Sequence, residues 1–341
     1  MSFRRKKSAS RSKLNRLLAV LLVAPLAAAA TLEIGTRIFI RQEALVYQDS
    51  RDPRLGFELK PGAEGYKSGS WVRIDSLGLR QPEMQATKSS NEFRVLVVGD
   101  HPSFALGLPE EAGYVQQLRQ FFRLPPDVPF SVANLSMYNY NLEQKMESFK
   151  RRGALFDADA VILQLGPRDL ERKPKPWLNR PGLKNFLREH SRFYRWMTER
   201  IFARRSPPSS GGESLPPDAP KKILALLSDF KKACGKPAMI AYFPDLSKGE
   251  TARAPAAIEP GLKHDAAKLG IPFINVSRAF DRHAPSALLL DPSKPYLNAL
   301  GQSLAAKAIA PHAVALAKHR LARLRPPRRR YPKLVPPERV P

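Results

Sequence analysis

The chain has a single cysteine, Cys234, among 341 residues. An intrachain disulfide and a cysteine-based metal site are therefore excluded. The sequence also lacks zinc-finger spacing, a glycine-rich phosphate loop and the aromatic motifs of RNA-binding modules. These absences matter because the formal net charge is +26 at pH 7, and a basic chain can bind nucleic acid, anionic lipid or acidic polysaccharide. Charge alone therefore assigns no function, and we expect no cofactor and no metal site.

Much of the positive charge lies at the two ends of the chain. Seven Lys and Arg residues lie between Arg4 and Arg16, and an apolar stretch from Leu17 to Leu32 follows, interrupted only by Pro25 and Thr31. A basic segment before an apolar one predicts membrane insertion with the basic end inside. This export signal disfavours a nucleic-acid partner.

Two interpretations of the apolar stretch remain open. The alanines at residues 27–30 resemble a signal-peptidase site, which would release a secreted protein. Alternatively, the stretch continues to Phe39 as an uncleaved anchor, with Glu33 and Arg37 near the far interface. We favour the anchor, although the uninterrupted run is short against the roughly 20 residues of a spanning helix. Both interpretations place the rest of the chain outside the cytoplasm, and the anchor predicts a single-pass protein of the cell membrane.

The sequence predicts five regions. They are a basic cytoplasmic leader at 1–16, an anchor at 17–40, an extended leader at 41–92, an α/β domain at 93–320, and a basic, proline-rich disordered tail at 321–341. We expect a short strand or hairpin near residues 71–74. Residues 205–221 have the composition of a flexible insert.

Apolar runs and helical patterns alternate through the predicted domain. Strands are expected at 94–98, 130–135, 160–165, 238–242 and 273–276, and helices at 113–122, 142–155, 181–204, 222–232, 260–268 and 299–319. Strands that alternate with helices predict parallel pairing through βαβ crossovers. The fold class is therefore α/β, with three layers, a parallel central sheet and a flavodoxin-like arrangement. No function follows from this alternation alone.

Five local stretches carry a resemblance to a known family. They are residues 73–80 (RIDSLGLR), 94–107 (RVLVVGDHPSFALG), 132–141 (VANLSMYNYN), 161–170 (VILQLGPRDL) and 291–301 (DPSKPYLNALG). Their order and spacing resemble the SGNH (GDSL-type) hydrolases, in particular the membrane-anchored members of the cell envelope. The resemblance implies a three-layer SGNH hydrolase fold and, in an intact member, esterase or O-acyltransferase activity.

The nucleophile and the oxyanion hole of the family are replaced here. The family's nucleophile is the Ser after Gly-Asp, and this position is His101. The loop Gly whose N–H binds the oxyanion corresponds to Ser136, and the Asn of the hole corresponds to Arg168. An imidazole has no hydroxyl to acylate, and losing one oxyanion donor costs roughly 10²–10³ in rate. A nucleophilic or basic His101 and a relocated Ser103 nucleophile are the catalytic alternatives.

The catalytic base is replaced as well. The family's Asp-x-x-His supplies the base and the group that orients it. Depending on the placement of a two-residue insertion, the His position falls on Lys294 or Tyr296, so that only Asp291 remains of the catalytic set. The resemblance thus implies a hydrolase-like protein with degenerate motifs.

Polar residues next to these positions are the candidates for ligand binding. They are Asp100, Ser103, Asp169 and Asn298. Arg168 can bind a carboxylate, sulfate or phosphate in bidentate fashion. Alternatively, it forms an ion pair with Asp291 or Asp100 that fills the old pocket.

Three functional hypotheses follow. The first, which we favour, is a non-catalytic envelope protein that binds a glycan, a lipid or a protein partner. The second is an active esterase or O-acyltransferase on envelope polysaccharide or acyl esters. The third is an adaptor on an anionic membrane surface, to which the basic, aromatic segment 192–205 would contribute as an interfacial helix. An ordinary amphipathic helix is the alternative for that segment.

Overall fold

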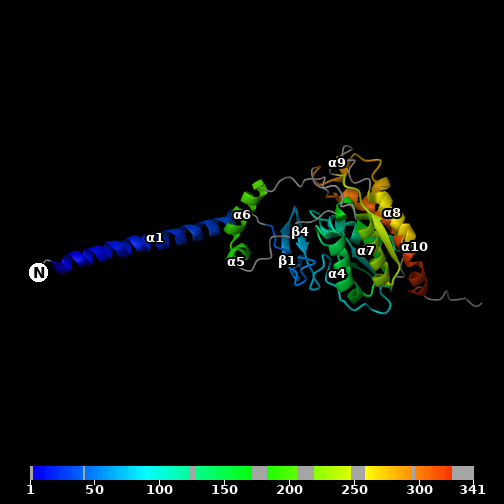
Figure 1. Ribbon diagram of the computed structural model, residues 1–341, viewed down its shortest axis with the longest axis horizontal. Coiled ribbons are helices and arrows are strands. Elements are labelled where there is room, and N and C mark those ends of the chain that lie inside the picture. Colours follow the sequence, from blue (N-terminus) through cyan, green and yellow to red (C-terminus); the bar gives the residue numbers. More distant parts are fainter. Residues whose placement is uncertain are drawn as a thin grey trace, which may run out of the picture. The chain divides into compact units, whose positions relative to one another are not determined.

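A computed structural model describes residues 3–40, 43–122, 128–170, 183–205, 219–246, 258–292 and 296–324 (Figure 1). The chain forms two compact units. One comprises residues 1–44 and 176–213, and the other comprises residues 45–175 and 214–341. Most of the predicted insert 205–221, most of the predicted tail 321–341 and Lys294 lie outside the described residues.

The first unit consists of three helices. They are α1 (Phe3–Phe39), α5 (Leu183–His190) and α6 (Arg192–Arg205). The basic leader and the apolar stretch form one continuous helix, in which the 20 residues Val20–Phe39 are long and apolar enough to cross a membrane. By length and composition, this segment fits a membrane anchor or a signal sequence.

A five-stranded parallel sheet forms the centre of the second unit. Its strands are β5 (Phe93–Val98), β6 (Phe130–Asn134), β7 (Ala160–Leu165), β8 (Ala238–Tyr242) and β9 (Phe273–Asn275), in the order β6-β5-β7-β8-β9. In chain order this is 2-1-3-4-5, the flavodoxin-like arrangement. The predicted fold class is therefore confirmed, as are all five predicted strands.

Helices cover both faces of this sheet. Strand β5 shows why, because Val95 and Val97 belong to one hydrophobic cluster and Leu96 and Val98 to the other. The first cluster includes residues of α3 (Tyr114–Gln117) and α10 (Ala299–Leu324). The second includes residues of α4 (Leu142–Arg152), α7 (Ala219–Cys234) and α8 (Ile258–Lys268). A strand that is buried on both faces must be apolar throughout, which explains the continuous run seen in the sequence.

Several short elements connect this framework. The helix predicted at 113–122 is wrong in its second half, because α3 ends at Gln117 and a 3₁₀ turn continues to Phe121. This turn is η2 (Leu118–Phe121). The other short helices are α2 (His101–Phe104) and α9 (Pro285–Leu288), and the other 3₁₀ turns are η1 (Glu110–Ala112), η3 (Gly153–Phe156), η4 (Pro167–Leu170) and η6 (Val276–Ala279).

The leader before the sheet forms two antiparallel hairpins. Strand β1 (Tyr47–Asp49) pairs with β2 (Phe57–Leu59), and β3 (Glu64–Lys67) pairs with β4 (Ser70–Arg73). The second hairpin contains most of the segment where a short strand was expected. Arg80, only 1% exposed, ties the leader to the domain by donating to the carbonyls of Phe104, Ala105 and Leu108.

A buried arginine connects several segments at the amino edge of the sheet. Arg94, at 1% exposure, donates to the carbonyl oxygens of Ala86 (2.6 Å), Gln85 (3.1 Å) and Phe156 (3.1 Å). Its Nε lies 2.8 Å from Oε1 of Glu92. Because each donor of the guanidinium fork meets an acceptor, the charge is compensated despite its burial.

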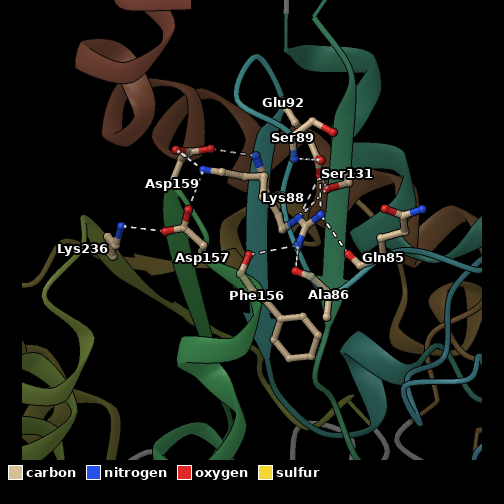
Figure 2. Close-up of polar contacts among 11 residues, drawn as sticks. Gln85, Ala86, Lys88, Ser89, Glu92, Ser131, Phe156, Asp157, Asp159 and Lys236 are labelled. Atoms are coloured by element: carbon tan, nitrogen blue, oxygen red, sulfur yellow. Dashed lines mark hydrogen bonds and ion pairs between the residues drawn. The ribbon is translucent and has the colours of Figure 1, made fainter.

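A second ionic group lies beside this arginine. Figure 2 shows Lys88 between Asp157 and Asp159, and Lys236 on the outer side of Asp157. The Lys88–Asp159 pair is 2.7 Å long, and both side chains are less than one-tenth exposed. The two groups together join the leader to strand β5 and to the segment before β7.

We predict that Arg94→Met destabilises the protein by about 3–5 kcal/mol, because a buried carboxylate and several carbonyls lose their donor. The matched control is Arg119→Met, whose side chain is exposed and should change stability by no more than about 0.5 kcal/mol. Urea unfolding of the detergent-solubilised full chain, followed by circular dichroism, measures both. Equal midpoints for the two variants would contradict this account of Arg94.

Candidate functional site

The motif blocks meet at the carboxyl edge of the sheet. Strand β5 ends just before Asp100 and His101, β6 ends just before Ser136, and β7 ends shortly before Asp169. Parallel strands end at a common edge, and in open α/β sheets this edge carries the ligand site. The structure therefore brings together the residues that the sequence placed in separate blocks.

A tight turn after β5 positions the first block. A Cβ at Gly99 would lie 2.4 Å from Oγ of Ser103 and 2.6 Å from Oε1 of Gln164, so only glycine fits there. Gln164 accepts the N–H of Asp100 at 2.7 Å, which fixes the turn onto β7.

Ser103 lies beneath this turn. It is 2% exposed, and its Oγ is 2.6 Å from the hydroxyl of Tyr114 and 3.2 Å from Oε1 of Gln164. Burial raises the pKa of Tyr114 above its usual range, so this phenol is no base at neutral pH. The geometry therefore does not favour Ser103 as a relocated nucleophile.

His101 packs against two tyrosines. Its ring centroid lies 5.5 Å from that of Tyr138 and 5.9 Å from that of Tyr296, with the Tyr296 ring edge-on. The hydroxyls of Tyr138 and Tyr296 are 2.8 Å apart. We call His101, Tyr138 and Tyr296 the aromatic cluster.

The chain segment around Tyr296 contains both candidates for the base position. Leu289 and Leu297 form an antiparallel bridge, and the N–H of Leu290 donates to the Tyr296 carbonyl at 2.8 Å. Of the two candidates for the position of the family's histidine, Tyr296 contacts His101, whereas Lys294 lies outside the described residues. The residue at the nucleophile position of the resemblance and one of the two candidates for its base position are therefore neighbouring rings.

Lys145 is the main residue of the site that the sequence reasoning missed. It is 0% exposed on α4, and its Nζ lies 2.5 Å from Oδ1 of Asp169, 3.6 Å from Oδ2 of Asp100 and 3.0 Å from the Gln164 carbonyl. We call Asp100, Lys145 and Asp169 the ionic triad. The spacing from Leu142 and Phe149 was the available signal, because it places Lys145 on the buried face of the helix.

Burial changes the protonation of Asp169. Burial raises the pKa of Asp169 to about 6; the Lys145 ammonium opposes this shift and the Asp100 carboxylate adds to it. The N–H of Gly166 donates to Oδ2 of Asp169 at 2.6 Å. This lysine holds the acidic side chains that the sequence assigned either to a ligand or to Arg168. The backbone of Arg168 lies in η4, and its side chain is outside the described residues.

The region corresponding to the oxyanion hole is also altered. The N–H of Ser136 points to Oδ1 of Asn134 at 3.3 Å, while the Asn134 amide donates to the Ser103 carbonyl at 3.0 Å. The Ser136 hydroxyl is buried and has no hydrogen-bond partner among the described residues. A donor that the resemblance assigns to an oxyanion thus has a partner within the protein.

The last block holds the start of α10. Asn298 donates through Nδ2 to the Ala287 carbonyl at 2.8 Å and accepts the Gly301 N–H at 3.1 Å. Its polar atoms therefore stabilise the chain between α9 and α10 rather than facing the cleft. Asp291 is half-buried in the loop between the bridged leucines.

One small pocket lies beside the aromatic cluster. The pocket lined by Asp100, His101 and Gly166 has a volume of about 30 Å³. That volume holds only one or two waters, whereas pockets for small ligands run to about 300–1,000 Å³. An acylated sugar does not fit into this pocket.

The sequence matches no family model and no curated protein. Solved structures that align with about two thirds of the chain include the following three. TesA is 16% identical, with 65% of this chain and 99% of TesA covered and a TM-score of 0.43. A catalytic mutant of Axe2, an acetylxylan esterase from Geobacillus stearothermophilus, is 14% identical over 68% of this chain and 96% of Axe2, with a TM-score of 0.43. A lipolytic G-D-S-L family member from Veillonella parvula is 11% identical over 64% and 96%, with a TM-score of 0.39.

At these identities and TM-scores, the similarities transfer no activity or substrate to this chain. What the chain itself shows is a three-layer α/β fold. Its strand order is flavodoxin-like, and the residues of its motif blocks gather at the carboxyl edge of the sheet.

We predict that Lys145→Met destabilises the protein by about 3–5 kcal/mol at pH 7, because two buried carboxylates lose their cation. The loss should be smaller at pH 5. Burial raises the pKa of Asp169 to about 6 in the wild type, so this carboxyl is mostly protonated at pH 5 and then needs the lysine less. A carboxyl whose folded pKa is raised contributes stability that is present at low pH and is lost as the pH rises through that pKa.

Lys150→Met is the matched control on the same helix. Lys150 pairs with Asp229 at 3.1 Å, and both side chains are about half exposed, so the expected loss is below about 1 kcal/mol. Denaturant titrations at the two pH values test both variants. A Lys145→Met loss that matches the control, or that is the same at both pH values, would contradict the assigned role of the ionic triad.

Proposed function

We propose that this protein is a membrane-tethered, SGNH-hydrolase-like protein of the cell envelope that does not act as a serine esterase and instead binds a partner. The observation that carries the proposal is the contact between His101 and Tyr296. An imidazole occupies the nucleophile position, and a phenol occupies the base position. A phenol has a pKa near 10 and remains protonated at neutral pH, so this pair cannot generate an alkoxide.

The ionic triad supports the same proposal. A transition-state oxyanion is stabilised by donors that are preorganised and not otherwise engaged. Here the buried Lys145 ammonium is neutralised by Asp169 and Asp100, and the Ser136 N–H points to Asn134. The small pocket beside His101 further argues that a partner binds on the surface around the former cleft and not within it.

The N-terminal helix supports the tether. The segment Val20–Phe39 follows a basic leader, and a basic flank favours the cytoplasmic side. With this orientation, the unit that carries the sheet lies outside the cytoplasm.

Among a glycan, a lipid and a protein, the surface around the former cleft favours an envelope glycan. The ring of Tyr47 stacks near that of Tyr138 at 6.5 Å, and Lys67 lies over Tyr47 at 5.7 Å. Aromatic side chains combine an apolar face with a polar tip, and sugars present both C–H faces and hydroxyl groups. A protein or lipid partner remains an outcome of the binding test.

The rival function is an active esterase or O-acyltransferase that uses His101 or Ser103. We expect hydrolysis of p-nitrophenyl acetate by the purified full chain to equal the buffer blank, and to remain there in His101→Ala and Ser103→Ala. Turnover by wild type that disappears in either variant would refute the non-catalytic proposal and identify the replacement residue. A fluorophosphonate probe, which labels activated serines, should leave wild type unlabelled.

For the glycan partner, we expect the full chain to co-sediment with insoluble peptidoglycan sacculi. Tyr47→Ala should weaken this binding about tenfold, as expected for the loss of an aromatic contact of about 1.4 kcal/mol. Leu155→Ala, which removes an exposed apolar side chain (60% exposed), serves as the control and should not change it. If wild type fails to sediment, or if both variants weaken equally, peptidoglycan is not the partner recognised by this surface.

A further inference from the structure

The first unit contains a contact that the function of the second unit does not explain. Glu33, within the apolar part of α1, accepts the N–H of Arg192 at 3.0 Å, the N–H of Phe193 at 3.0 Å and the Ser191 hydroxyl at 2.8 Å. Arg37 completes the site, with its Nε 2.7 Å from Glu33. A carboxylate of α1 thus caps the first turn of α6 and is satisfied by its donors.

This contact fixes the depth of α6 relative to the candidate span. Glu33 precedes the end of that span, Phe39, by six residues, which is about 9 Å along a helix. If Val20–Phe39 crosses the bilayer, α6 must begin near the boundary between headgroups and acyl chains. Amphipathic helices that lie in a membrane surface sit at this depth, about 5–10 Å into the boundary.

The exposed side chains of the pair α5–α6 suit that depth. Leu183 and Phe186 lie three residues apart on α5 and are 72% and 57% exposed, so they form one apolar face. On α6, Trp196 and Tyr194 are half-buried, and the guanidinium of Arg200 lies 5.3 Å from the Trp196 ring. Aromatic rings of this kind are enriched at the membrane–water interface.

The charge of the two helices specifies the surface. Residues 183–205 contain seven Lys and Arg residues against two Glu residues. Such a basic, aromatic segment is attracted to anionic lipid headgroups and not to neutral ones.

We propose that α5 and α6 form an interfacial collar, which Glu33 holds against α1 and which binds anionic lipid headgroups beside the anchor. Figure 1 shows both helices next to the end of α1 that carries Glu33. The collar rests on the membrane tether of the proposed function. It fixes a second contact with the bilayer, in addition to the spanning helix.

The experiment measures the depth of α5 in a bilayer. The full chain, with Cys234→Ser and a single Leu183→Cys or Leu155→Cys, carries a nitroxide label in nanodiscs of phosphatidylcholine with or without phosphatidylglycerol. Leu155 is 60% exposed on the second unit and serves as the water-exposed reference. With phosphatidylglycerol, we expect about threefold lower accessibility to a nickel chelate at position 183 than at position 155, as for a helix in the interface. The protection should be weaker without the anionic lipid, because only the cap then holds the two helices at the surface.

The cap is tested in the same assay. Glu33→Ala should raise nickel accessibility at position 183 to the value at position 155. Thr31→Ala should not, because its hydroxyl bonds only within α1, to the Ala27 carbonyl at 2.9 Å. If position 183 is as accessible as position 155 in anionic discs, the collar is refuted; if it is protected equally in both lipids, the anionic specificity is refuted.

Failure of the tether gives a different result. A chain that does not co-elute with nanodiscs has no anchor, which would refute the membrane part of the proposed function. A chain that co-elutes while position 183 remains exposed to water refutes the collar alone.

Discussion

The second unit is organised around one buried ammonium group. Lys145 reaches from α4 to the carboxyl edge of the sheet, where it meets Asp169 at 2.5 Å and the Gln164 carbonyl at 3.0 Å. Moving an isolated ion into the protein interior costs several kcal/mol, so the lysine and its carboxylates persist only as a set. Gln164, whose backbone carbonyl binds Lys145, also accepts the Asp100 N–H through its side chain. The turn after β5 and the end of β7 are therefore held through shared partners. The polar groups at this edge of the sheet thereby form one ionic cluster.

The aromatic cluster follows from this arrangement. The carboxyl edge of a parallel sheet is normally the ligand side, and here the ionic triad lies beneath it while the rings of Tyr138 and Tyr296 lie beside His101. The Tyr138–Tyr296 hydroxyl contact gives each ring a polar partner, which a tyrosine needs when it is partly buried. On the proposed function, two rings that pack against each other stand where the family has its nucleophile and base.

The sequence predicted the framework well because burial acts on it through simple periods. Strands β5 and β7 are buried at every position and therefore read as unbroken apolar runs. Their carboxyl ends then had to bring His101 and Asp169 to one edge. The choice between Lys294 and Tyr296 could not be made in the same way, because it depends on the path of a loop closed by the Leu289–Leu297 bridge. Lys145 was missed for a different reason. A lysine on the inner face of an amphipathic helix usually extends its charged end to solvent, and only the distant Asp100 and Asp169 make burial favourable.

The distribution of charge separates the two parts of the molecule. The formal charge of the whole chain is +26, yet the ionic triad holds one lysine against two aspartates. Asp245 also lines the small pocket next to them. Unit charges about 4 Å apart interact strongly where water is excluded, and among the described side chains of this region the carboxylates outnumber the one lysine. The positive charge of the sequence is instead concentrated in the basic leader, in the helices beside the anchor and at the basic end of the chain. On the proposed function, a partner at the carboxyl edge of the sheet meets aromatic faces and hydroxyl groups beside His101. The chain thus carries two regions of different chemistry, one basic and one aromatic, and the two proposals assign a different partner to each.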